Sequence, residues 1–159
     1  SLSKHLEVAL FTKKPMCIGT TGNINMESLR EAARSIPIFY SANFSLGIAL
    51  MHQAAQEIAK RFSSTIKIMG THHVKKKDAP SGTALLLQEA VGNAQIQSIR
   101  QSDVFGIHEL HFQANDEELV IVHKAKNLNA FAKGALLAAQ FLVEQLPGFY
   151  TMEDMNLSK

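Results

Sequence analysis

Residues 71–85, THHVKKKDAPSGTAL, hold the most informative pattern of the chain, because they join a predicted strand to a predicted helix through a basic loop. The residues that lead into the loop, 65–73 (TIKIMGTHH), alternate in a way that predicts a strand. Residues 82–94 (GTALLLQEAVGNA) predict a helix, and Ser81 stands where an N-cap is expected. A strand followed by a helix along the chain is typical of α/β folds.

The same stretch concentrates groups that can bind an anion and transfer a proton. Because alternate side chains of a strand share a face, we expect His72 and Lys76 to point the same way while the strand lasts. The helix that follows presents free backbone N–H groups and the positive end of its dipole, and both favour an anion. His73, Lys76 and the Ser-Gly-Thr start of the helix could together bind a small acid that carries carboxylates. The alternative is a solvated basic loop in which Ser81 is an ordinary helix cap.

Two groups of elements are predicted on either side of a weak boundary near Ala42. Before it the order is helix, strand, helix, strand, which is half of a parallel α/β unit. After it come a long amphipathic helix, the strand and helix around the basic loop, two strands joined at Asn115-Asp116, and a last long helix. The additional elements are expected at residues 2–14, 15–22, 25–35, 36–42, 44–62, 107–114, 117–125 and 129–146. We therefore predict an α/β (α+β) fold whose main part is a mixed open sheet with helices on one face.

The segments GTTG (19–22) and SANFS (41–45) follow the first two predicted strands. In doubly wound folds, ligands bind at the carboxyl ends of the strands, and glycine there permits close approach of the backbone. Phe44 could pack against the helix behind it or stand beside a planar ring. The alternative for both segments is a plain turn between a strand and a helix.

Composition limits the classes of function that the chain can have. Its 159 residues are 46% hydrophobic and 19% charged, with a formal net charge of only +2, so we expect an ordinary core and neither nucleic acid nor membrane as partner. The lone cysteine, Cys17, excludes a disulfide within one chain, favours a cytoplasmic location, and is expected to be a small buried hydrophobe. No metal site is expected, because zinc needs about four ligands and His108 and His111 would lie on opposite faces of a strand.

The basic stretch resembles the signature of the dihydrodipicolinate reductase family (4-hydroxy-tetrahydrodipicolinate reductase) of lysine and diaminopimelate biosynthesis. The histidine pair, the lysine four residues after the first histidine, and the run D-A-P-S-G-T-A recur there in the same order. The resemblance extends over about residues 15–150 and includes GTTG, SANFS, GIHELHF (106–112) and HKAKNLNAFAKGAL (123–136). It implies reduction of a cyclic dicarboxylate by NADH or NADPH, and assembly as a homotetramer.

The resemblance also assigns roles to individual residues. It implies that His72 is a proton donor or acceptor and that Lys76 is a proton donor. The implied substrate-binding residues are His73, Ser81, Gly82 and Thr83. The implied cofactor-binding residues, which would border the nicotinamide end, are Gly19, Thr20, Thr21, Ser41, Ala42, Asn43 and Phe44.

Several features of the sequence depart from the family pattern. No G-x-G-x-x-G dinucleotide fingerprint occurs, Leu128 stands where many relatives carry arginine, and the segment between Ala94 and His108 is shorter than usual.

We therefore expect residues 1–42 to be the remnant of a parallel, doubly wound dinucleotide-binding domain. Residues 43–150 would be a substrate-binding and oligomerisation domain, and residues 151–159 a tail. The alternative function is a non-catalytic dicarboxylate-binding or assembly module derived from that enzyme.

Overall fold

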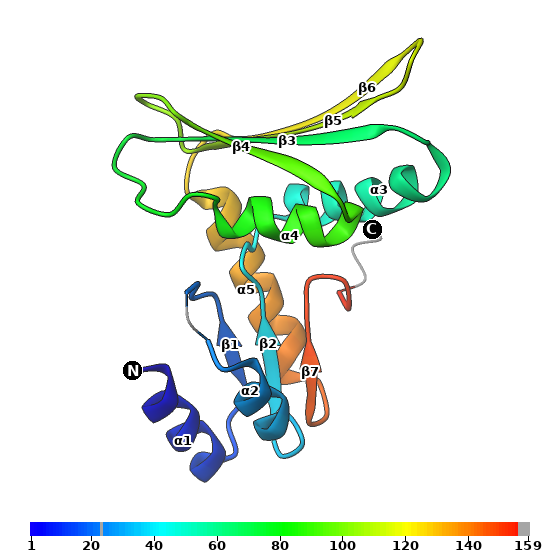
Figure 1. Cartoon of the computed structure of the whole chain (residues 1–159). Helices are drawn as coiled ribbons and strands as arrows, with labels where there is room; N and C mark the ends of the chain where they lie inside the picture. The colour runs from blue at the N-terminus through cyan, green and yellow to red at the C-terminus, as the bar shows by residue number, and fades with distance from the viewer. Residues whose placement is uncertain (23, 156–159) are drawn as a thin grey trace. The chain divides into compact units, whose positions relative to one another are not determined.

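The computed structural model describes residues 1–22 and 24–155, which form two compact units (Figure 1). The first unit contains Ser1–Leu46 together with the chain from Phe131 onward, and the second contains Gly47–Ala130. The sequence analysis placed residues 131–150 with the second domain, whereas the structure groups them with the first. The chain therefore crosses between the units twice rather than once.

The first unit is built on a small parallel sheet with the strand order β1-β2-β7. The two middle residues of its apolar central strand, Ile38 and Phe39, are both at 0% exposure. The strands are β1 (Met16–Ile18), β2 (Pro37–Tyr40) and β7 (Gly148–Tyr150), and the helices are α1 (Leu2–Thr12), α2 (Met26–Ala32) and α5 (Asn129–Val143). The predicted parallel strand-helix-strand piece is thus present as β1, α2 and β2.

Strand β7 was not predicted, because it is only three residues long and follows the helix-ending pair Pro147-Gly148. It pairs in parallel with β2, with Ile38 opposite Phe149. This pairing brings the end of the described chain back to a strand that lies more than a hundred residues earlier. The residues at 156–159 of the predicted tail lie outside the described residues.

The second unit contains a four-stranded mixed sheet in the order β4-β3-β5-β6. Strands β3 and β4 are parallel, whereas the β3–β5 and β5–β6 pairs are antiparallel. The strands are β3 (Thr65–His72), β4 (Ala94–Arg100), β5 (Gly106–Gln113) and β6 (Glu118–Ala125), and the helices are α3 (Leu46–Arg61) and α4 (Gly82–Val91). Both helices lie on one side of the sheet (Figure 1), which confirms the predicted mixed open sheet with helices on one face.

Alternation in the central strands supplies the core of this unit. Ile68 of β3 and Leu110 and Phe112 of β5 are at 0% exposure and pack with Ile48 and Leu87 from the helices. The hairpin predicted at Asn115-Asp116 is confirmed as the β5–β6 connection. Among the described residues, no helix has the length and apolar character needed to cross a membrane.

Strand β4 was not predicted, since the helix was expected to continue to residue 94. The helix instead ends at Val91, and Gly92 adopts a positive φ of 80°, which favours glycine and turns the chain back. Polar residues such as Gln95 and Gln97 are exposed on this edge strand, which weakens the apolar signal of a strand. The short segment between Ala94 and His108 therefore contributes a full parallel neighbour to β3.

Candidate functional site

The carboxyl end of β3 places His72 inside the second unit. Its side chain is buried at 6% exposure, and its ring meets the ring of His108 edge-on, with centroids 4.9 Å apart. Hypothetical Cβ atoms on Gly70 and Gly106 would each stand 3.6 Å from the His72 ring, so two glycines flank the imidazole. His108 reaches this position because β5 pairs it with Gly70 across the sheet.

Both imidazoles are neutral at pH 7. Burial is the main cause that lowers the pKa of His72 to about 4, and the positive charges of Lys76 and Arg100 lower it further. Burial likewise lowers the pKa of His108 to about 3, with His72 as a secondary cause. His72 can therefore accept a proton or a hydrogen bond at neutral pH, but it holds no charge in the unliganded protein.

Ser81 connects the histidine pair to the start of α4. Its Oγ accepts a hydrogen bond of 3.2 Å from the Ala84 N–H, which makes Ser81 the N-cap of the helix. The same oxygen lies 3.5 Å from Nε2 of His108. Ser81 and Thr83 are buried, and Gly82 between them is partly exposed. The cap that the sequence suggested is thus real, and it stands against a buried neutral histidine.

The basic loop does not continue the strand as the alternation of residues suggested. Strand β3 ends at His72, and the chain turns at once, with the Lys76 N–H donating to the carbonyl of His73 at 3.1 Å. Lys76 therefore approaches the site through a turn, and its charge still acts on His72. His73 is exposed.

Lys76 is the most sheltered lysine of the loop. Its side chain is 27% exposed, and its Nζ pairs with Oδ2 of Asp78 at 2.8 Å. A hydrogen bond from the lysine lowers the pKa of the Asp78 carboxyl. Lys75 and Lys77 are exposed. A dicarboxylate that binds Lys76 would therefore share it with Asp78 or displace Asp78.

Sequence reasoning missed Arg100, the last residue of β4. Its Nε donates to the carbonyl of Lys76 at 3.1 Å, and its Nη2 donates to the carbonyl of Asp78 at 2.6 Å. The next residue, Gln101, donates its N–H to the carbonyl of His72 at 3.0 Å. No local pattern could reveal these contacts, because they depend on the parallel pairing of β4 with β3.

The two predicted cofactor segments meet within the first unit. They follow the neighbouring parallel strands β1 and β2, and the Ser41 N–H donates to the carbonyl of Ile18 at 3.1 Å. The ring of Phe44 lies over Gly19, where a Cβ would come within 2.8 Å of it, and stacks on Phe39 at 5.9 Å. Phe44 is therefore partly buried rather than freely exposed. Beside it, residues 19–21 are exposed.

Cys17 is exposed on β1, and the sequence-based expectation that it is buried is wrong. It faces away from the core that its neighbour Ile18 joins. Nevertheless, partial burial raises the pKa of the thiol. Among residues 1–22 and 24–155, no group of three or more histidine, cysteine or acidic side chains is arranged to hold a metal ion.

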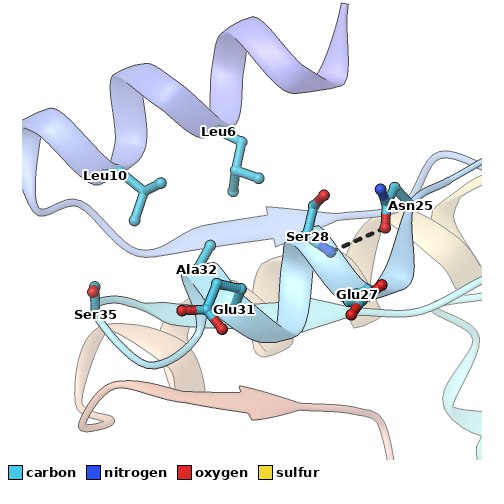
Figure 2. A pocket seen from close by; sticks show the side chains of 8 residues that line it. All are labelled: Leu6, Leu10, Asn25, Glu27, Ser28, Glu31, Ala32 and Ser35. Carbon is cyan, nitrogen blue, oxygen red and sulfur yellow. Dashed lines mark hydrogen bonds between the residues drawn. The ribbon is translucent and has the colours of Figure 1, made fainter.

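A groove of about 540 Å³ lies between α1 and α2 of the first unit (Figure 2). Leu6, Leu10 and Ala32 form its apolar part, and Glu27 and Glu31 are also among its lining residues. None of its lining residues is a predicted site residue, and negative charge makes it a poor site for an anionic ligand. His72 and Lys76, the predicted proton-transfer residues, lie instead at the end of β3 and in the loop behind it.

The sequence matches known proteins of one family. A family model described as dihydrodipicolinate reductase, C-terminus, matches residues 47–155. The 4-hydroxy-tetrahydrodipicolinate reductase of Bdellovibrio bacteriovorus is 36% identical over 167 residues, and the match covers 100% of this chain and 73% of that protein. The enzyme of the same name from Rickettsia rickettsii is 35% identical, with 97% and 74% covered.

A solved structure also shares the fold. The dipicolinate-bound dihydrodipicolinate reductase from Paenisporosarcina sp. TG-14 aligns with a TM-score of 0.80 at 19% sequence identity. The alignment covers 97% of this chain and 69% of that one.

Proposed function

The chain belongs to the dihydrodipicolinate reductase family, and we propose that it provides the substrate site for reducing a cyclic dihydrodipicolinate-type dicarboxylate to tetrahydrodipicolinate. This step serves lysine and diaminopimelate biosynthesis, and a cytoplasmic location is part of the proposal. The observation that carries it is the convergence, within one unit, of neutral His72, the Lys76 ammonium and the start of α4.

The start of α4 and the basic loop fit the two carboxylates of such a substrate. Gly82 and Thr83 offer backbone N–H groups at the positive end of the helix, where an anion is stabilised. His73 and Lys76 supply side-chain donors from the loop. Charge-assisted hydrogen bonds of this kind hold a ligand in one orientation as well as binding it.

Lys76 and His72 divide the proton chemistry between them. Reduction of a C=N or C=C bond leaves negative charge on the substrate, and a nearby acid must neutralise it. The Lys76 ammonium can donate that proton, whereas neutral His72 accepts a hydrogen bond or a proton from the same region. A bound dianion would raise the pKa of His72, because an opposite charge favours the protonated ring.

The nicotinamide cofactor of the family would supply the hydride. The residues at the ends of β1 and β2 fit its nicotinamide end, because Gly19 lies against the Phe44 ring and the Gly-Thr-Thr segment that it begins is exposed. We propose that Gly19, Thr20, Thr21 and residues 41–44 border the nicotinamide ring, and that the cofactor is NADH or NADPH. The 159 residues contain no glycine-rich fingerprint for the pyrophosphate.

Calorimetric titration with pyridine-2,6-dicarboxylate, a planar analogue of the substrate, tests the site. The full chain should bind it, and Lys76→Ala should weaken binding by about 1.5–3 kcal/mol, because a charge-assisted contact is lost. Lys77→Ala removes an exposed lysine of the same loop and is the matched control. Equal affinities for wild type and Lys76→Ala would rule out the proposed anion site.

The second candidate is a dicarboxylate-binding or assembly module without hydride transfer. It would use the same anion-binding groups, namely the Lys76 ammonium and the start of α4. The two functions separate when NADH oxidation is followed with substrate present, since the module binds the dicarboxylate and leaves NADH unchanged.

We also propose that the chain forms a homo-oligomer, a tetramer by resemblance to its family, through the sheet of the second unit. The face opposite α3 and α4 carries Val120 and Val122, which are 41% and 46% exposed. Glu109 and His111, their partners on β5, add a carboxylate and a polar ring to this face. A second copy of the chain fits a face of such mixed apolar and charged character.

A further inference from the structure

Arg100 lies where its side chain contacts the backbone of the basic loop. It ends β4 in parallel register with His72, the last residue of β3. All three types of guanidinium nitrogen donate to backbone carbonyls, namely Nε to Lys76, Nη2 to Asp78 and Nη1 to Ile99. Three of its five N–H donors therefore hold backbone carbonyls.

The geometry of these bonds fixes the part of the loop from which Lys76 projects. The carbonyls of Lys76 and Asp78 are two residues apart, and a rigid planar fork holds both at 3.1 and 2.6 Å. Lysine in place of Arg100 could keep the charge, but a single ammonium cannot reproduce a fork of fixed donors. The Lys76–Asp78 ion pair spans the same two residues, so the arginine and the ion pair stabilise one shape of the loop.

The exposure and the like charges of the loop both favour its opening. His73, Val74, Lys75 and Lys77 are exposed, and the three consecutive lysines repel one another. An exposed turn with few buried groups opens easily on its own. Arg100 bonds to neutral carbonyls, so it orders the loop without neutralising the Lys76 ammonium.

We propose that Arg100 is the positioning residue of the dicarboxylate site: it fixes the backbone of residues 76–78 so that the Lys76 ammonium is presented to the ligand. This inference rests on the proposed function and deepens it. Arg100 acts through Lys76 and does not itself bind the dicarboxylate.

A double-mutant cycle separates action through Lys76 from direct binding. With pyridine-2,6-dicarboxylate as probe, Arg100→Lys should weaken binding at least about fivefold, in line with the strength of hydrogen bonds that involve a charged group. In the Lys76→Ala background the same substitution should change affinity by less than about twofold, because there is no ammonium left to position. Arg61→Lys, a matched change on the exposed end of α3, should change neither value.

Limited trypsin digestion gives a readout that does not depend on the ligand. Arg100→Lys should speed cleavage after Lys75 and Lys77 at least about threefold, because loosened loops are cut from their open state. Thermal melting checks that each variant is folded, and Arg100→Gln, which keeps one donor group and removes the charge, replaces Arg100→Lys if that variant is unstable.

The outcomes separate a failure of the role of Arg100 from a failure of the proposed function. An equal loss of affinity in both backgrounds, no loss in either, or unchanged cleavage of the loop would each overturn the role of Arg100. If the wild-type chain does not bind the dicarboxylate at all, the proposed function fails, and faster cleavage in Arg100→Lys would then support only the ordering of the loop.

Discussion

At the scale of single residues, the candidate site depends on two histidines that stay neutral because they are buried. His72 and His108 have pKa values of about 4 and about 3, whereas a histidine in an unfolded chain titrates near 6.5. In the site, His72 is thus suited to accept, and the ammonium of Lys76 is the group that can donate.

The same two pKa values predict that the protein loses stability in mild acid. As pH falls from about 6.5 toward 4, the unfolded chain takes up protons at both positions and the folded chain does not, so the free energy of unfolding decreases. Each histidine contributes a slope of about 1.4 kcal/mol per pH unit in this window. Urea titrations at several pH values measure how the free energy of unfolding depends on pH. His108→Gln should lower the slope of that dependence by about 1.4 kcal/mol per pH unit, which corresponds to one proton. A variant with the wild-type slope would show that His108 becomes protonated in the folded state.

The sequence led to His72 and Lys76 but not to the residues that shape their surroundings. The sequence pattern indicated only that His108 is a poor metal ligand, and it indicated no role for Arg100. Both reach the site through strand pairing, His108 opposite Gly70 and Arg100 beside His72. Register between strands distant in sequence is set by the whole sheet, so it leaves no local signature around either residue.

At the scale of elements, the long helices, the hairpin and the apolar strands β1 and β2 were predictable, whereas strands β4 and β7 were not. The long helix at Leu46–Arg61 and the hairpin from Gly106 to Ala125 follow their expected periods. Strands β4 and β7 are an edge strand rich in polar residues and a strand of three residues, so their formation depends on partners rather than on their own pattern.

At Gly134 of α5, helix propensity and packing predict opposite changes in stability for a substitution by alanine. Gly134 of α5 lies directly against the carbonyl of Phe44, and a Cβ there would collide with that oxygen. Helix propensity alone predicts that Gly134→Ala stabilises the protein by about 1 kcal/mol. Because backbone blocks the new methyl group, we expect destabilisation by about 1–3 kcal/mol instead, measured by urea unfolding. A stabilised variant would show that α5 and Phe44 move apart readily.

At the scale of the whole molecule, we expect self-association through the uncovered face of the β4-β3-β5-β6 sheet. Val122→Glu places a charge on this face opposite Glu109, so like charges and lost apolar contact should both oppose association. Sedimentation velocity should show a shift to smaller species. The far-ultraviolet circular dichroism spectrum should stay unchanged, since the secondary structure is retained. Val8→Glu, on an exposed part of α1, is the matched control and should leave the distribution as in wild type. An unchanged distribution in Val122→Glu would assign assembly to another surface.

The pairing of β7 with β2 has a consequence for how the chain becomes folded during synthesis. The second unit is continuous in sequence, and its strands and helices are neighbours along the chain, so it can form as soon as residues up to 130 have emerged. The first unit is split, and its sheet stays without one strand until residues 148–150 are made and return to residues 37–39. Closing so long a loop is entropically costly and slow compared with pairing between neighbours. Completion of the sheet that carries the segments assigned to the cofactor therefore waits until residues 148–150 have been synthesised, whereas the loop and helix assigned to the dicarboxylate can already be in place.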